Sequence, residues 1–303
     1  MENEKFTEEQ VQKLLALLNE DTTGPAAPEI ATTDENLSLD KIFQQTDLPS
    51  LGRQIFSVLP MTGPTAAIFN IKTDKINPSD KKAVLLRNEV EVYPSESIST
   101  GITQEVVQDI RAQYGMFADQ IIGKLLRGLA NDQENTRTLE FLDAQSLAVQ
   151  DLQLSDSLNA EVNLFEVTQK VHESVLKMNN KNFRTYEAFA VIPATALGGI
   201  LGLTQYAGGE EDDRDNLLVT VIGKTKFYLN PDPTSTTAYV GLKDTRNPSR
   251  SSAVFSPYMS NIVEATDPDN GNINYHLYNR FAITASPLHE TDNEMLYKFN
   301  ILV

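Results

Sequence analysis

The chain has 303 residues, of which 40% are apolar, and its 25 Lys and Arg against 42 Asp and Glu give a formal net charge of −17. This length is typical of about two domains of roughly 150 residues each, and the apolar content is enough for a folded core. The lack of cysteine excludes disulfides, thiolate nucleophiles and thiolate metal sites, and the excess of acid argues against nucleic-acid binding through overall charge.

The first forty residues differ from the rest because they hold ten acids and two bases, a net charge of −8. Thr7 and Gln10 have the spacing of a capping box at the start of a helix. The apolar residues that follow recur on one helical face: Val11, Leu14, Leu15 and Leu18. A helix this short cannot bury an apolar face alone. We therefore expect an arm that packs either on its own domain or on a neighbouring copy or partner, and the sequence leaves both open.

Strand patterns begin near Leu51, where residues 54–60 form a first extended run. Residues 66–72 and 84–92 are two further extended runs, and the polar stretch 73–82 separates them. This order predicts a long β-hairpin. A lone hairpin is marginally stable in water, so we expect it to rest on another part of the protein.

Two helices are predicted further along the chain. Apolar residues recur at spacings of three and four from about residue 103 to 147, and Gly115 marks a break or kink within this stretch. The same period returns at residues 164–178. The first of these helices would be the longest element in the protein.

The remaining apolar runs predict short strands, in the order 189–192, 217–229, 238–242, 252–264, 273–285 and 295–303. The run 217–229 is either one strand or a tight pair broken at Gly223. Asn270 and Gly271 give the strongest signal for a hairpin turn in the chain. These patterns predict a mixed protein of helices and strands with no internal repeat.

No motif in the sequence supports catalysis. Gly223-Lys224-Thr225 copies the end of a phosphate-binding loop, but the first glycine of that motif would fall on Leu218, and a strand stands where the motif requires a helix. The three histidines have no partner at metal or catalytic spacing: His172, His276 and His289. The acidic run 210–213 has the pattern of a solvated loop. We predict no enzyme, no cofactor and no metal site.

Several segments resemble, in order, the major capsid protein of T-even-type tailed phages. Residues 48–69, with FSVLPMTGPT at 56–65, resemble the entry into the core of that family, and QDIRAQYGM at 108–116 resembles the start of its long spine helix. The closing strands resemble the family at YVGLK, FSPY and YNRFAI, at 239–243, 255–258 and 278–283. Each match is short, and their common order and similar spacing carry the resemblance.

This resemblance implies the α+β tailed-phage capsid fold. Its parts would be an N-terminal arm at 1–47, a peripheral domain at 48–182 with an extended hairpin (66–93) and a spine helix (103–147), an axial domain at 183–232 and closing strands at 233–303. It also implies a structural role: copies would assemble as hexamers and pentamers into an icosahedral shell that encloses DNA without sequence-specific binding. The expected location is the virion, after assembly in the host cytoplasm and without a membrane.

Two departures from the family affect these expectations. The T-even protein carries an inserted domain near its hairpin, whereas about ten residues, 73–82, form the tip here. Leu18-Asn19-Glu20 fits the cleavage context of the family's protease, but Asp21 is a poor residue after it, so we expect the arm to be retained. Further partners implied by the resemblance are vertex, portal, scaffold and decoration proteins. An encapsulin-like compartment with the same fold is the alternative.

Basic residues around the hairpin are candidates for contacts between subunits. They are Arg53, Lys72, Lys75, Lys81, Lys82 and Arg87, together with the apolar face of the arm at Val11, Leu14, Leu15 and Leu18. Their counterparts would be acids on a neighbouring arm or spine helix, namely Glu8, Glu9, Glu105 and Asp109. The alternative is that these charges are solvated and each contributes little to stability.

Overall fold

The computed structural model describes residues 49–73, 83–94, 96–103, 105–108, 111, 118–154, 160–182, 187–194, 196, 217–266, 272–287 and 295–302. The described residues divide into two compact units. One unit takes its residues from 95–133 and 259–279, and the other from 49–94, 134–258 and 280–303. The predicted N-terminal helix, the Asn270–Gly271 turn, the acidic run 210–213 and His289 lie outside the described residues.

The larger unit contains a seven-stranded sheet with the order β5-β13-β10-β7-β9-β8, and β6 pairs beside β13. Its strands are β5 (Leu147–Ala148), β6 (Leu152–Gln153), β7 (Glu187–Ile192), β8 (Leu218–Ile222), β9 (Thr225–Leu229), β10 (Thr237–Lys243) and β13 (Leu296–Leu302). The central strand β7 runs antiparallel to β10 and parallel to β9. Strands β8 and β9 turn at Gly223, whose φ of +65° suits glycine, so of the two alternatives for 217–229 the tight pair is observed.

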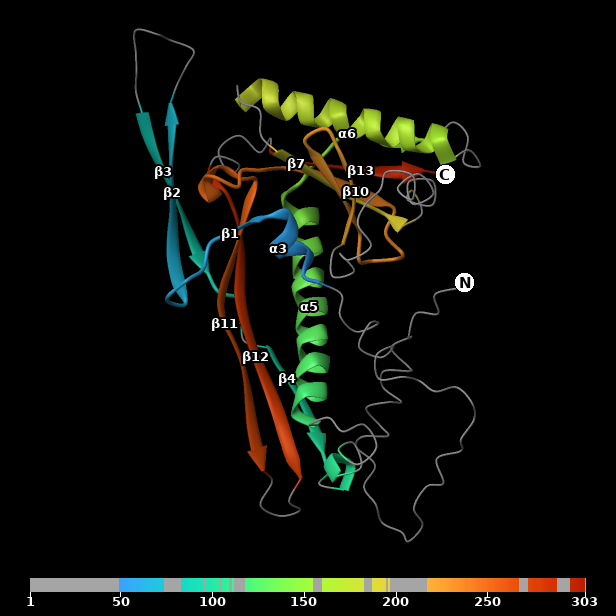
Figure 1. Cartoon of the computed structure of the whole chain (residues 1–303). Coiled ribbons are helices and arrows are strands. Elements are labelled where there is room, and N and C mark those ends of the chain that lie inside the picture. The colour runs from blue at the N-terminus through green and yellow to red at the C-terminus, as the bar shows by residue number, and fades with distance from the viewer. Residues whose placement is uncertain are drawn as a thin grey trace. The chain divides into compact units, whose positions relative to one another are not determined.

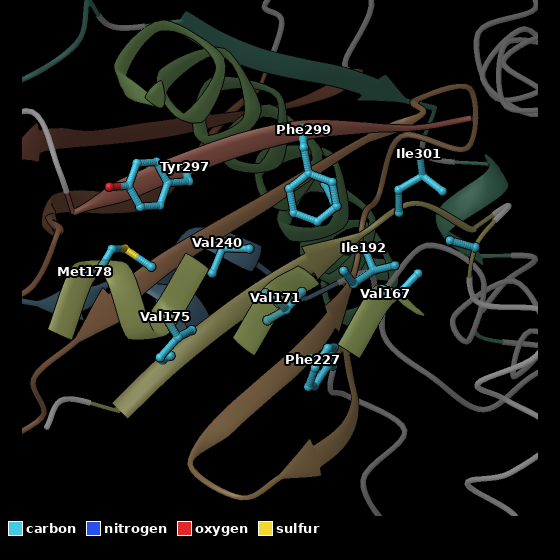
Figure 2. Packing of buried hydrophobic residues seen from close by; sticks show 14 of the residues in the cluster. Val167, Val171, Val175, Met178, Ile192, Phe227, Val240, Tyr297, Phe299 and Ile301 are labelled. Carbon is cyan, nitrogen blue, oxygen red and sulfur yellow. The ribbon is translucent and has the colours of Figure 1, made fainter. Parts of the chain in front are cut away.

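Helix α6 (Ala160–Asn182) packs on this sheet with one side (Figure 2). Four of its side chains, spaced three and four residues apart, are buried there: Val167, Val171, Val175 and Met178. They belong to one apolar cluster with strand residues, among them Ile192, Phe227, Val240 and Phe299. The other side of α6 leaves Phe165 and Leu176 exposed. The 3.6-residue period of the sequence therefore corresponds to the buried side of this helix.

The same unit carries the two-stranded hairpin of β2 (Thr65–Thr73) and β3 (Ala83–Glu91) (Figure 1). The strands are antiparallel, with Ile68 opposite Asn88 and Phe69 opposite Arg87. Ile68 and Val90 are buried in a small cluster with Val254 and Ala282. The hairpin thus rests on its own unit with one face.

The smaller unit is built on a helix and antiparallel strands. Helix α5 (Ala118–Gln145) and strands β11 (Ala253–Thr266) and β12 (Ile273–Ala285) contribute residues to both units, whereas β4 (Glu96–Ile102) belongs to the smaller one. β4 pairs antiparallel with β12. The core of this unit consists of Ile102, Ile122, Leu126, Ala130, Tyr275 and Leu277.

The strand predicted at residues 54–60 is confirmed only at residues 57 and 58, and residues 54 and 55 are helical. Residues Leu51–Ile55 form a short helix, α3, and only Ser57–Val58 form a strand, β1, which pairs parallel with β11. A five-residue helix is too short to show a helical period, and its position is fixed by side chains from α5 that are distant in sequence. Around the predicted start of the long helix, residues 105–108 are helical and Thr103 Oγ1 accepts the Val106 N–H at 3.4 Å.

Candidate functional site

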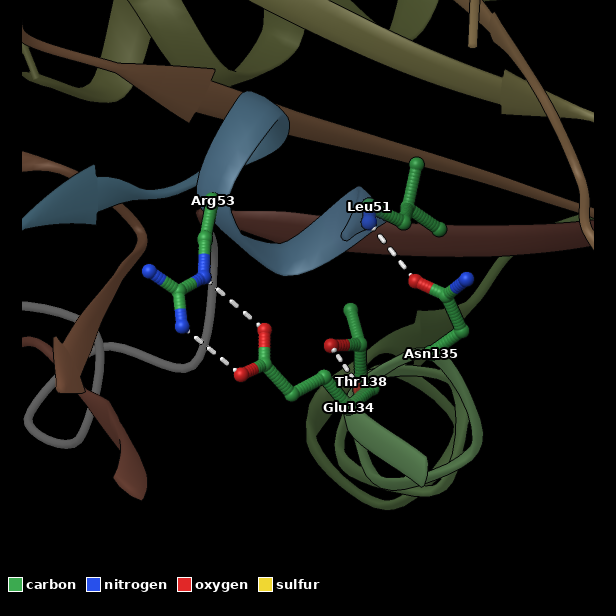
Figure 3. A network of polar contacts seen from close by, with 5 residues as sticks. All are labelled: Leu51, Arg53, Glu134, Asn135 and Thr138. Atoms are coloured by element: carbon green, nitrogen blue, oxygen red, sulfur yellow. Dashed lines mark hydrogen bonds and ion pairs between the residues drawn. The ribbon is translucent and has the colours of Figure 1, made fainter. Parts of the chain in front are cut away.

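Helix α3 is held against α5 by an ion pair between Arg53 and Glu134 (Figure 3). Arg53 donates from Nε and Nη2 to the two carboxylate oxygens of Glu134 at 2.9 and 2.8 Å. The Glu134 side chain is 1% exposed and that of Arg53 is 44% exposed. The hydrogen bond that Arg53 donates to Glu134 raises the pKa of Arg53, and the guanidinium also lies over the Phe255 ring at 5.1 Å. Because the carboxylate is buried, its pairing with Arg53 is a condition for stable packing here.

A second set of contacts caps the start of α3 (Figure 3). The Leu51 N–H donates to Asn135 Oδ1 at 2.7 Å, and Asn135 Nδ2 donates to the Pro49 carbonyl at 3.3 Å. Gly52 passes close to α5, since a Cβ at this position would lie 2.6 Å from Thr138 Oγ1. One turn of α5 therefore supplies the missing cap of α3 and leaves no space for a side chain at Gly52.

One face of the hairpin is fixed by two asparagine side chains. Asn70 Nδ2 donates to the Ser249 carbonyl at 2.6 Å, and Asn88 Nδ2 donates to the Ala285 carbonyl at 2.9 Å. Ser249 belongs to the short 3-10 helix η1 (Pro248–Arg250). Together with the burial of Ile68, these bonds attach one face of the hairpin to its own unit.

Among the described residues, none forms a comparable anchor on the opposite face of the hairpin. Phe69 is 52% exposed and Leu85 is 64% exposed. Beside them, Arg87 Nη2 donates to Glu89 Oε1 at 2.8 Å in an exposed pair. Exposed apolar side chains next to a charged rim are typical of a surface that binds another protein.

The structure places two of the predicted contact residues fully. Arg87 lies on the outer face of the hairpin, and Arg53 bonds within its own chain to Glu134. Lys72 lies in β2, but the surroundings of its side chain are not described. The other predicted residues lie outside the described ranges: Val11, Leu14, Leu15, Leu18, Lys75, Lys81 and Lys82.

The sequence analysis missed Glu134, Asn135 and the exposed pair Phe69 and Leu85. The two polar residues are more than 80 positions from their partners in α3, and no local pattern indicates that pairing. The exposed pair did leave a signal. Apolar residues follow one another at 66–69, and a strand that is apolar at consecutive positions is typically covered on both faces.

The described residues also bear on the candidate metal and catalytic residues of the sequence. Within the described residues there is no group of three or more His, Asp or Glu side chains placed to hold a metal ion. His172 lies exposed on α6, and His276 stacks against Tyr278 with 6.4 Å between ring centroids. In the described part of the chain, no helix is long and apolar enough to cross a membrane.

Comparisons with known proteins give one family and a set of related structures. The family model for Major capsid protein Gp23 matches residues 84–301, whereas curated proteins give no match. A chain from Mycobacterium phage Che8 is 12% identical, with 78% of this chain and 85% of that chain covered and a TM-score of 0.54. A virus-like particle from Pyrococcus furiosus gives 13% identity, coverage of 86% and 98%, and a TM-score of 0.53.

A phage-related protein from Bordetella bronchiseptica also matches, at 12% identity, with 86% of this chain and 96% of that chain covered and a TM-score of 0.53. At these identities the matches show a shared fold alone. They confirm the α+β fold class expected from the sequence.

Proposed function

The chain belongs to the Gp23 major capsid protein family and is thus a subunit of a phage capsid shell, and we propose that its copies form hexameric and pentameric capsomers of an icosahedral head. The family match over residues 84–301 is the observation that carries this proposal. It favours the phage shell over an encapsulin-like compartment, which the fold alone would also allow. The family is a structural one, and its members are components of the virion.

Contacts between copies would use the outer face of the hairpin. Phe69 and Leu85 are exposed there, although the opposite face is anchored to its own unit. A neighbouring copy that covers these side chains would remove apolar surface from water, which stabilises the assembly by about 25 cal/mol for each Å² buried. Many such modest contacts add up in a closed shell because every subunit binds several neighbours.

The charged contacts inferred from the sequence are part of this proposal. Arg87 lies on the same outer face as Phe69 and can meet an acid of a neighbour, with Glu89 as its present partner. Lys72, Lys75, Lys81 and Lys82 would add further basic contacts from the hairpin, and the face formed by Val11, Leu14, Leu15 and Leu18 would pack on a neighbour. Arg53 has the weakest claim, because Glu134 of its own chain already engages two of its three guanidinium nitrogens, Nε and Nη2.

The shell would hold DNA without sequence-specific contacts. A net charge of −17 disfavours tight binding to phosphates, which suits a container that must release its contents. We propose assembly in the host cytoplasm, with vertex, portal, scaffold and decoration proteins as further partners.

Negative-stain microscopy and sedimentation of the purified full chain test this function. We expect megadalton shells, or rings of capsomer size under conditions that slow assembly. A chain that stays a compact monomer at all protein concentrations and salt conditions would contradict the proposal.

A further inference from the structure

Basic side chains gather around one cavity of the larger unit. The cavity has a volume of about 640 Å³ and is lined in part by Lys224, Lys226, Lys243, Arg246 and Arg250, which we call the basic pocket. Among the described residues that line this space, two carry carboxylates, Glu187 and Asp244. In a chain with a net charge of −17, a concentration of five basic residues around one cavity is unusual.

Strand register brings these residues together. Lys243 of β10 lies opposite Glu187 of β7, and the pairing of Ala188 with Thr225 places Lys224 at the other side of Glu187. In this register Glu187 therefore lies between two lysines of neighbouring strands. Lys226 stands further along β9 and lines the same cavity.

The second carboxylate, that of Asp244, accepts hydrogen bonds from backbone N–H groups. Asp244 Oδ1 accepts the N–H groups of Arg246 and Asn247 at 2.9 and 3.0 Å and so shapes the loop that carries Arg246. Within the part of the chain that the structure describes, no carboxylate forms an ion pair with Lys224, Lys226, Arg246 or Arg250. The pocket thus has more positive charge than its own residues neutralise.

The loop that presents the two arginines is held in place. Ser251 Oγ accepts the Asp244 N–H at 2.8 Å, and Ser249 Oγ donates to Asn247 Oδ1 at 2.8 Å. At the other wall, Lys243 donates to the Gln54 carbonyl. Burial, with the charge of Lys226 adding to it, lowers the pKa of Lys243 to about 8. An anion in the cavity would stabilise the protonated form of Lys243. It would also meet side chains on a loop whose position is already fixed by hydrogen bonds.

We propose that the basic pocket binds carboxylates from the acidic N-terminal segment, residues 1–40, of a second copy of this chain. The inference rests on the proposed function, because it requires neighbouring copies. That segment has a net charge of −8, opposite to the charge of the pocket. The sequence places 48 residues before Pro49, and at about 3.3 Å for each extended residue a stretch of this length can span up to about 160 Å.

Two other anions fit less well. The acidic run 210–213 lies between β7 and β8, so it is tethered at both ends, and it has less reach than the N-terminal segment. Duplex DNA carries its phosphates along a continuous outer surface, whereas this pocket is a cavity with Glu187 among its lysines. Separate carboxylate side chains can enter such a cavity singly.

Carbodiimide cross-linking of isotopically mixed shells tests the proposal. Shells would be assembled from equal amounts of unlabelled and ¹⁵N-labelled full chain, and a water-soluble carbodiimide would join lysine amines to the carboxylates in contact with them. We expect cross-links from Lys224 or Lys226 to acids within residues 1–40. Roughly half of these should combine one light and one heavy peptide, which is the random expectation for pairs between copies.

Several outcomes would overturn the proposal. They are cross-links from these lysines to the acids of 210–215, cross-links within one copy only, no cross-links, and protection of the lysines only when DNA fills the shell. Shells that form without the expected cross-links reject this inference alone, whereas a chain that forms no shells rejects the proposed function and this inference with it.

A charge variant gives a second readout. Lys224→Gln with Lys226→Gln should raise several-fold the protein concentration at which half of the chain assembles, because two cations of the pocket are lost. Lys177→Gln on the exposed side of α6 is the matched control and should leave this concentration unchanged. Equal assembly of the double variant and the control would count against the pocket as an inter-subunit site.

Discussion

The α6 core and the hairpin β2–β3 lie in the same unit but differ in how far their apolar side chains are buried. In the core, Val171 and Phe227 are fully buried between helix and sheet (Figure 2). On the hairpin, Phe69 is 52% and Leu85 is 64% exposed. The core side chains are buried by residues of the same chain. The hairpin is anchored on one face by its own unit, and apolar side chains are exposed on its outer face. The subunit therefore separates the residues that keep it folded from those available to bind its neighbours.

The largest expected effect on the free energy of unfolding comes from the core. Phe227→Ala removes a fully buried ring and should destabilise the subunit by about 3–5 kcal/mol through lost burial and a cavity. Urea titration of unassembled subunits measures this loss. The matched control is Phe165→Ala on the exposed side of α6, which should stay within about 0.5 kcal/mol of the parent. Similar losses for the two variants would contradict the assigned burial of α6.

The next largest effect is expected at the contact between α3 and α5. Arg53→Met leaves the Glu134 carboxylate buried without its ion pair. Because Arg53 is itself 44% exposed, water can reach the site, and we expect a loss of about 2 kcal/mol, below the range for fully buried pairs. The double variant Arg53→Met with Glu134→Gln should recover most of that loss. No recovery would show that packing on Phe255, and not charge, dominates this contact.

The sequence predicted elements with a periodic pattern and missed features that depend on residues distant in the chain. Periodic patterns over many residues identified α6 and the strands β11 and β12, because a helix side or strand face that is buried within the chain leaves a period. The helix α3 was not predicted, and its last two residues were assigned to a strand, since its cap comes from Asn135, 84 positions away. The basic pocket was missed for a similar reason, because β-strand register joins Lys224 to Lys243 across a gap in the sequence. The family resemblance supplied the capsid function, which no period could reveal.

A smaller effect is expected from a single methyl group at the α3–α5 contact. Gly52→Ala places a Cβ within 2.6 Å of Thr138 Oγ1 and 3.0 Å of Phe255 Cδ2, so either α3 or the Thr138 side chain must shift. We expect a loss of about 1–2 kcal/mol in urea titrations, within the usual range for overpacking. Thr138→Ala in the same chain should relieve part of the clash. If Gly52→Ala is neutral, the close approach of α3 to α5 is not maintained in solution.

The smallest effect on unfolding, and the largest on assembly, is expected at the outer face of the hairpin. Phe69→Ser with Leu85→Ser removes apolar side chains that are already more than half exposed, so the free energy of unfolding should change by less than about 0.5 kcal/mol. The same variant should lose most of its assembled fraction in sedimentation, because the apolar surface for neighbouring copies is gone.

As a control on the hairpin, Arg87→Gln disturbs only an exposed ion pair and should weaken assembly less. Loss of subunit stability in the double variant would mean that this face packs within the chain, and intact assembly would mean that neighbours bind elsewhere. Only normal unfolding together with failed assembly fits a subunit whose fold is complete and whose hairpin is reserved for its neighbours.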